Sequence, residues 1–155
     1  MIKQSTNSLR SDGNVFKVLG LGFMGGLAGT LVMDALLMGI LAAAGRPVLF
    51  CFTIVGSTIA RLITVLGYDI SGGIPLGILT HYVIGPLVGL LYASLVLRSN
   101  RLQAGSLRNY FLFALVFIQI FSQPLLALAP ILLELPAEIT ILWYGGAVIM
   151  HTILA

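Results

Sequence analysis

Long runs of apolar residues, separated by short polar or Pro- and Gly-containing segments, make up most of this chain. The longest runs are residues 16–44, 74–97, 109–128 and 137–155. At a rise of 1.5 Å per residue, each is about long enough to cross a hydrocarbon core roughly 30 Å thick. The pattern therefore predicts four transmembrane helices.

The apolar segment 48–66 has a different pattern from these four. It carries polar side chains at helical spacing, namely Thr53, Ser57, Arg61 and Thr64. One polar stripe on an apolar helix is typical of an amphipathic helix lying in the membrane interface. The expected fold is therefore all-α, with an interfacial helix between the first and second spans. Residues 1–14 are polar and aperiodic and are predicted to be a disordered arm, while 15–155 form one transmembrane domain.

The basic residues indicate how the chain is threaded through the membrane. They cluster in the N-terminal arm and in the segment 98–108, and are Lys3, Arg10, Lys17, Arg98, Arg101 and Arg108. The positive-inside rule places both clusters on the cytoplasmic side, so an even number of crossings must separate them. The segment 48–66 is then not a span of its own. We expect a multi-pass protein of the bacterial inner membrane with both termini cytoplasmic.

Composition supports the membrane interpretation and excludes several functions. Charged residues make up 8% of the chain, against about 25% in soluble domains, so lipid must replace water as the solvent. The basic residues form no dense patch beside aromatic residues, which argues against nucleic acid. The single cysteine, Cys51, excludes an internal disulfide and is expected to be a small apolar residue in a packed helix.

The first span opens with a glycine motif. Residues 20–25 (GLGFMG) match G-x-G-x-x-G, but a dinucleotide fingerprint needs a preceding strand and an acid about 20 residues on, and Asp34 is too close. Small residues four apart instead let helices approach closely in lipid. The glycines predicted to pack helices in this way are Gly22, Gly25, Gly26, Gly29, Gly85 and Gly89.

Few polar residues fall within the predicted spans, and most of them belong to the outer half of the membrane. The predicted polar cluster is Asp34, Arg61, His81, Gln123 and Glu138. A carboxylate in hydrocarbon is costly, so Asp34 should face protein and contact His81 or Arg61. Two interpretations stay open. The cluster is either a hydrogen-bonded clasp that fixes the bundle, or the lining of a proton path or small-ligand pocket.

The two histidines, His81 and His151, are candidate ligands for haem or a chlorophyll-type pigment. They are expected at different depths, about 10 Å and about 22 Å into their spans, and so should not share one metal. No group of His, Cys and acidic residues has the spacing of a metal site, and no catalytic set is recognisable. We therefore expect no metal and no enzyme activity.

Two sequence stretches resemble a group of small bacterial membrane proteins. GFMGGLAGTLVMDALL contains an opening Gly-rich pattern, and THYVIGPLVGLLYASLV contains a later H-x-x-x-G-x-x-x-G-x-x-Y-A pattern. Over residues 22–33 and 81–93 the chain is similar to the YagU-like and related uncharacterised families. This resemblance implies a four-helix membrane fold and leaves the function open.

Three functions remain under consideration. The first is a small non-catalytic subunit of a larger bacterial membrane complex of photosynthetic or respiratory type. Its partners would be other membrane-protein subunits and lipids, with the glycine faces and the interfacial helix filling gaps between them. The alternative is an autonomous small transporter or channel built on the outer-half polar site. A weaker alternative is binding of a pigment or haem through a membrane histidine.

Overall fold

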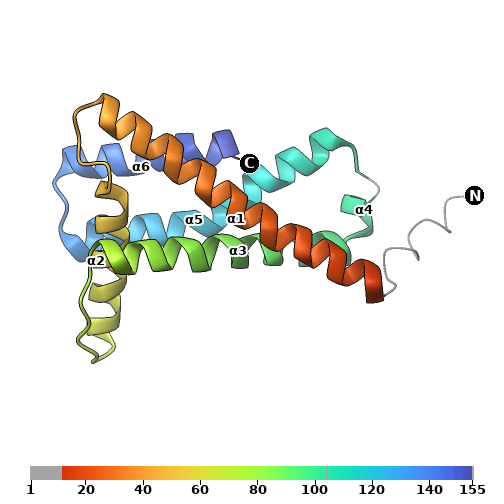
Figure 1. The fold of residues 1–155 in the computed structure, drawn as a ribbon, viewed down its shortest axis with the longest axis horizontal. Coiled ribbons are helices and arrows are strands. Elements are labelled where there is room, and N and C mark those ends of the chain that lie inside the picture. Colours follow the sequence, from red (N-terminus) through yellow and green to blue (C-terminus); the bar gives the residue numbers. More distant parts are fainter. Residues whose placement is uncertain (1–11, 104, 155) are drawn as a thin grey trace, which may run out of the picture.

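The computed structural model describes residues 12–103 and 105–154, and this part of the chain is entirely helical outside its turns and links (Figure 1). Its elements are α1 (Asp12–Ala43), α2 (Phe50–Val65), α3 (Ile74–Arg98), the one-turn α4 (Asn100–Gln103), α5 (Leu107–Leu133) and α6 (Ala137–Leu154). Most of the predicted polar arm, residues 1–11, lies outside the described residues. Its last residues, 12–14, are already part of α1.

Three of these helices are long and apolar enough to cross a membrane, and they identify the chain as a multi-pass membrane protein. They are the α1 segment Gly13–Ala43, α3 and α5. The 25 residues of α3 alone extend for about 37 Å, more than the hydrocarbon core requires. The predicted count of four crossings is not reached, because α6, with 18 residues, is not among the helices that qualify.

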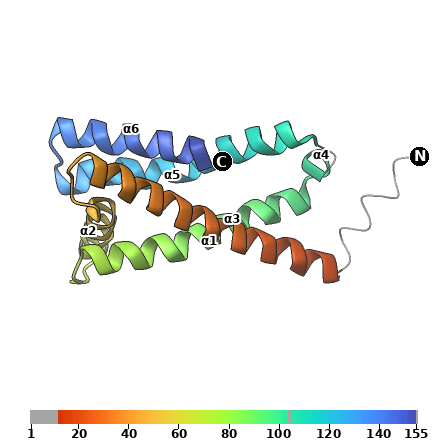
Figure 2. The ribbon, with the colours of Figure 1, turned by 45° about the horizontal axis from the view of Figure 1, so that its top comes forward.

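The helix α2 lies across the other long helices, at the end of the molecule where α1 ends and α3 begins (Figures 1 and 2). It packs against both α3 and α5. Its buried residues are Phe52, Ile54, Gly56, Thr58 and Ala60, whereas the predicted polar stripe is exposed at Thr53, Arg61 and Thr64. The helix therefore has one face on the bundle and one polar face turned outward.

The crossing of α1 and α3 depends on glycine. A Cβ at Gly22 would lie 2.5 Å from the Cβ of Ala93 and 2.6 Å from the carbonyl oxygen of Gly89. A Cβ at Gly26 would collide with the backbone of Gly85. The two helix backbones are in direct contact, which only residues without a side chain permit in lipid.

The contact between α2 and α3 also depends on glycines that let the two backbones touch. A Cβ at Gly56 would collide with the carbonyl oxygen of Gly73, and one at Gly77 with that of Phe52. By contrast, nothing outside the helix's own backbone lies within 4 Å of a Cβ at Gly25 or Gly29. The predicted glycine faces are thus used within the chain at Gly22, Gly26, Gly85 and Gly89, and are open at Gly25 and Gly29.

The helix α5 is longer than the sequence pattern predicts. The expected span 109–128 is extended at both ends, and residues 129–133, which were expected to lie between two spans, continue the helix. The helix passes through Pro130, which has no N–H to bond the carbonyl of Leu126 four residues earlier. The indole N–H of Trp143 on α6 donates to that carbonyl at 3.0 Å, so the proline is accommodated. The helix ends at Glu134, which has a left-handed φ of 50°.

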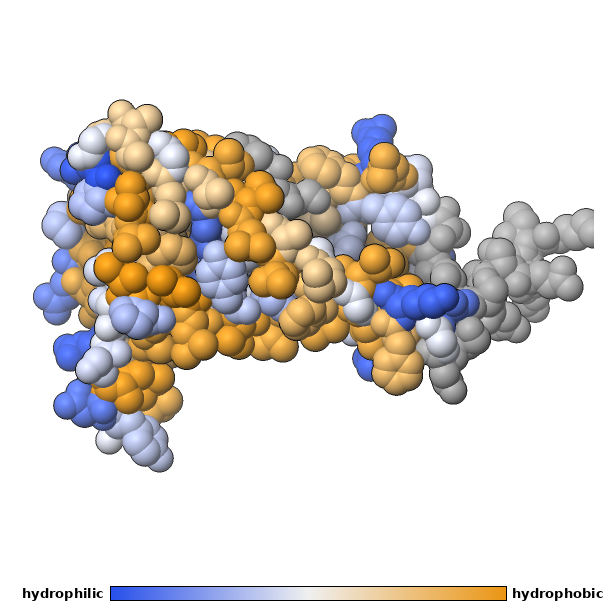
Figure 3. Space-filling model, in the orientation of Figure 1, coloured by the Kyte–Doolittle hydropathy of each residue, from blue (hydrophilic) through white to orange (hydrophobic). Residues whose placement is uncertain are grey.

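The outer faces of the bundle are strongly apolar. Among the described residues, the exposed large hydrophobic side chains far outnumber the buried ones, and Phe16 and Leu21 on α1 are 75% and 73% exposed. On the face seen in Figure 3, hydrophobic residues cover the middle and hydrophilic ones gather mainly at the two ends. This distribution fits a lipid environment or further helices around the bundle.

The close contact of α1 and α3 predicts that substitutions at the neighbouring residues Gly25 and Gly26 differ strongly in their effect on stability. Gly26→Leu should destabilise the protein by about 1–3 kcal/mol or more, because the new side chain meets backbone atoms that cannot move aside. Gly25→Leu, one residue earlier on the same helix, should change the stability much less. Thermal unfolding in detergent, followed by circular dichroism, compares the two. Equal melting temperatures for both variants would contradict the crossing.

Candidate functional site

The site is an acid–histidine pair that joins α1 to α3. The ring nitrogen Nδ1 of His81 lies 3.0 Å from Oδ1 of Asp34, and Asp34 is only 4% exposed. The residues of the crossing recur every four positions on both helices, so the pair continues the two rows of glycines. The row on α1 is Gly22, Gly26, Thr30 and Asp34, and the row on α3 is His81, Gly85, Gly89 and Ala93.

Thr30 lies between the glycines and the acid in the α1 row. Its buried hydroxyl donates to the carbonyl of Gly26 in the same helix at 2.9 Å. A Cβ at Gly85 would collide with this hydroxyl oxygen. Thr30 therefore satisfies its hydroxyl within its own helix and fills the space opposite Gly85. The hydrogen bond between the two helices is made instead by the next pair in the rows, Asp34 and His81.

The second ring nitrogen of His81 faces α2. Its Nε2 lies 4.0 Å from Sγ of Cys51, and the ring of Phe52 meets the imidazole edge-on with centroids 5.2 Å apart. Because a carboxylate only accepts hydrogen bonds, Nδ1 carries the hydrogen that is donated to Asp34. Nε2 is then directed at the thiol. Three helices meet here, α1 with the acid, α3 with the imidazole and α2 with the sulfur.

The other carboxylate oxygen of Asp34 has no hydrogen-bond partner. Oδ2 is buried, and among the described residues no donor reaches it. Tyr82, next to His81 on α3, is close enough to the same carboxylate to interact with it electrostatically and as a hydrogen-bond donor. His81 occupies Oδ1, and Oδ2 is the acceptor position left for Tyr82 or another donor.

The remaining members of the predicted polar cluster are not at this site. Arg61 is exposed on α2, about 15 Å along the helix from Cys51, because α2 lies across the bundle and only its first turn reaches His81. Glu138 is exposed in the first turn of α6. Gln123 instead donates to Oε1 of Gln119 at 3.1 Å. The five-residue cluster is therefore corrected to Asp34 and His81, with Cys51 added.

From the sequence, Cys51 was expected to be an ordinary packing residue, so its contact with His81 was not predicted. The available signal was the helix stop at Gly45, Arg46 and Pro47. A chain that turns back immediately after α1 brings the start of the next helix near the last turns of the first. A hydropathy pattern does not give the angle of α2 to the other helices, and this angle places the first turn of α2 over His81.

His151 lies on α6 and, among the described residues, makes no hydrogen bond through its Nδ1 to the acid–histidine pair. Its Nδ1 is buried, and no described residue accepts or donates a hydrogen bond to it. The described residues contain no group of three or more His, Cys, Asp or Glu that could hold a metal ion. Cys51, His81 and Asp34 form a chain of contacts, in which the imidazole uses a different nitrogen toward each neighbour.

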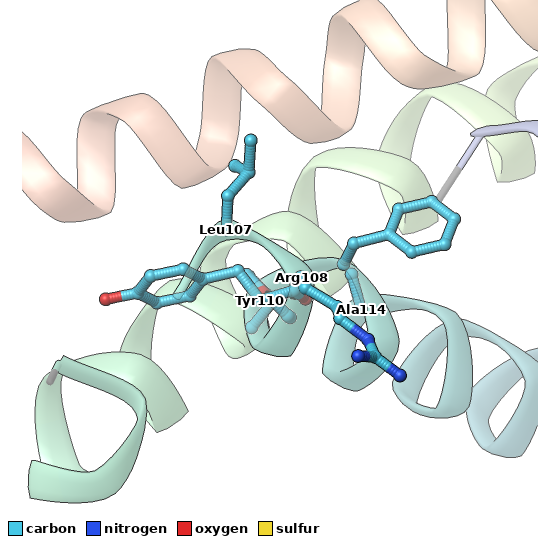
Figure 4. Close-up of a pocket in the computed structure, with 6 residues that line it drawn as sticks. Leu107, Arg108, Tyr110 and Ala114 are labelled. Atoms are coloured by element: carbon cyan, nitrogen blue, oxygen red, sulfur yellow. Dashed lines mark hydrogen bonds between the residues drawn. The ribbon is translucent and has the colours of Figure 1, made fainter. Parts of the chain in front are cut away.

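A separate cleft lies at the opposite end of α3, against the start of α5. It has a volume of about 660 Å³ and is lined by Tyr92, Leu107, Arg108, Tyr110, Phe111 and Ala114. Side chains fan out from the first turns of α5 around it (Figure 4). The hydroxyl of Tyr92 donates to the carbonyl of Tyr110 at 3.1 Å and ties α3 to α5 there. Tyr92 is eleven residues from His81, about 16 Å along the helix, so the cleft is not part of the acid–histidine site.

Comparison with known protein families, with characterised proteins and with solved structures finds no match to this chain. The chemistry of the site must therefore be judged from its geometry. Along the crossing, the next polar group beyond Asp34 is Thr30, which is bonded within its own helix, and then the glycines follow. The arrangement joins three helices and does not extend into a chain of polar groups along α1 and α3.

The pair can be tested by a double-variant cycle. His81→Leu leaves the buried carboxylate of Asp34 without its partner and should cost about 3–5 kcal/mol in the free energy of unfolding. Asp34→Leu combined with His81→Leu removes both polar groups and should recover most of that loss. Unfolding in detergent measures both variants. A double variant no more stable than the single one would rule out the pair as a mutual stabiliser.

Proposed function

We propose that this chain is a small non-catalytic membrane subunit that packs against other membrane-protein subunits of a larger bacterial complex. The observation that carries the proposal is the open face of α1, which we define as Leu21, Gly25, Ala28 and Val32. These residues are all exposed, on the side of the helix away from the row that packs on α3.

A glycine in a membrane helix weakens that helix unless it gains a close contact. Gly costs about 1 kcal/mol relative to Ala in a helix interior, and Gly22 and Gly26 recover this cost by packing on α3. Among the described residues, Gly25 and Gly29 have no such contact outside their own helix. A helix from another subunit, seated on the open face of α1, would pack on Gly25 in the same way.

The same proposal includes how the chain crosses the membrane. We take α6 as a fourth crossing, because its 18 residues extend for about 27 Å and it is joined to α5 by the bonds Trp143–Leu126 and Gln119–Thr152. The helix α2 then lies in the interface at the outer side. The basic residues at the other end place both termini in the cytoplasm.

A transporter or channel is the second candidate, and one observation favours it. The unused Oδ2 of Asp34 is a buried acceptor that a transported cation or proton could occupy. The subunit proposal is preferred, because Thr30 and the glycines interrupt any polar route along the crossing. For haem or a pigment, His81 is poorly placed, since Asp34 holds Nδ1 and Cys51 faces Nε2.

The subunit proposal predicts that Gly25→Leu prevents assembly with partner subunits but leaves the folding of this chain intact. Native purification of the wild type should yield stoichiometric membrane-protein partners, and the variant should lose them. Its melting temperature should stay close to that of the wild type, because no described residue outside α1 lies within 4 Å of a Cβ built at Gly25. Wild-type protein that purifies without any partner, or a variant that keeps all its partners, would refute the role of the open face of α1.

The topology predicts which side of the membrane each segment faces. In a Cys51→Ser background, Asn100→Cys should react with an impermeant thiol reagent only from the cytoplasmic side. Asp69→Cys, in the exposed link between α2 and α3, should react only from the other side. Labelling of intact cells and of inverted vesicles separates the two. Reaction of both residues from the same side would contradict the crossing by α3, and reaction of Asn100→Cys only from the outer side would contradict the interfacial position of α2.

A further inference from the structure

The three groups of the site stand in the order sulfur, imidazole and carboxylate. Sγ of Cys51 lies 4.0 Å from Nε2 of His81, and Nδ1 of the same ring lies 3.0 Å from Oδ1 of Asp34. A nucleophile within reach of a base, and a base oriented by a third group, is the arrangement that activates a side chain for covalent chemistry. From this geometry we propose that Cys51 is a self-acylating nucleophile, which takes a long-chain acyl group from an ester or thioester of the membrane.

Solvent exposure increases from the acid through the imidazole to the sulfur, as a site with a reachable nucleophile requires. The Asp34 side chain is 5% exposed and that of His81 is 14% exposed, while Cys51 is partly exposed. The orienting acid is therefore buried, and the sulfur is the member that a substrate can reach. The close α1–α3 crossing fixes the acid and the imidazole relative to each other, and Phe52 packs against the ring from α2.

The first turn of α2, which contains Cys51, has backbone donors without a backbone partner. In that turn, Phe50 N–H donates to the carbonyl of Pro47 and Thr53 N–H to that of Leu49. The amides between them, those of Cys51 and Phe52, are first-turn donors with no backbone acceptor in this turn. An acyl carbonyl attacked by Sγ gains negative charge on its oxygen, and these amides are suited to stabilise that charge.

The surroundings of the site select the class of substrate. Ile78, three residues before His81 and on the same side of α3, is an exposed hydrophobic residue, so an approaching ligand meets an apolar surface there. Cys51 is also five residues from Arg46, in the exposed turn that follows α1. A charged side chain of this kind belongs at the headgroup boundary, where the ester carbonyls of lipids lie. A long acyl chain with its carbonyl at that level fits both features.

The proposed step balances without an oxidant or reductant. Sγ attacks the carbonyl carbon of R–CO–X–R′, where X is oxygen or sulfur, and Nε2 of His81 takes the thiol proton. The C–X bond then breaks, the proton passes from His81 to X, and H–X–R′ leaves. Cys51 retains the acyl group as a thioester. Each chain is modified once, so the step adds a lipid anchor and does not require turnover. It is independent of the proposed partner subunit.

The direct test is the intact mass of the full-length protein. Purified protein is incubated in vesicles of phosphatidylglycerol and phosphatidylcholine, with or without added long-chain acyl-CoA. The wild type should gain one acyl chain that neutral hydroxylamine removes, and Cys51→Ser should gain none. A gain in vesicles alone identifies a lipid ester as the donor, and a gain only with acyl-CoA identifies a thioester. No gain in either arm overturns the proposal.

A second measurement distinguishes activation from mere packing. At a fixed pH, a small neutral alkylating reagent should modify wild-type Cys51 faster than the thiol of Thr53→Cys in a Cys51→Ser background. Position 53 is on the same helix and more exposed. His81→Gln and Asp34→Asn should each slow the alkylation of Cys51 by about tenfold or more. If Cys51 reacts no faster than the reference thiol, or if both variants react as fast as the wild type, the site is structural.

Discussion

The close antiparallel approach of α1 and α3 is the constraint on which the rest of this structure depends. Two rows of residues, spaced by four, face each other in register, so that Gly22 lies opposite Ala93 and Asp34 opposite His81. Where the backbones touch, only glycine fits. At the end of the same rows where α1 ends and α3 begins, longer side chains bridge the two helices. The polar pair is thus a product of the same register that brings the glycines together.

The other elements are arranged around this crossing. The helix α2 turns back across it, and its first turn brings Cys51 and Phe52 against His81. On the far side, α5 and α6 are joined where Trp143 bonds the carbonyl that Pro130 leaves free. The bond from Trp143 satisfies a carbonyl that lipid cannot. The outer surface is apolar, and the open face of α1 is exposed.

Much of this could be predicted from the sequence, because apolar runs and glycine spacings are local signals. The starts of α3 and α6 follow from them. The cost of a carboxylate in lipid further indicated that Asp34 contacts either His81 or Arg61, and His81 is the partner found. The end of α5 does not, since the effect of Pro130 depends on Trp143 in another helix. The places of Arg61 and Cys51 depend on the angle of α2, which residue spacing does not encode. Gln123 was expected at the acid–histidine site, but its amide bonds a neighbour on its own helix.

The central claim is that the glycine crossing positions the imidazole between acid and thiol. Nitrogen-15 NMR of the His81 ring tests it most directly, in the wild type and in Gly26→Leu and Gly25→Leu variants. We predict an Nδ1 signal of a hydrogen-bonded, protonated nitrogen that depends on Asp34, is lost in Gly26→Leu and persists in Gly25→Leu. An Nδ1 signal unchanged by Gly26→Leu, or absent from the wild type, would contradict the account.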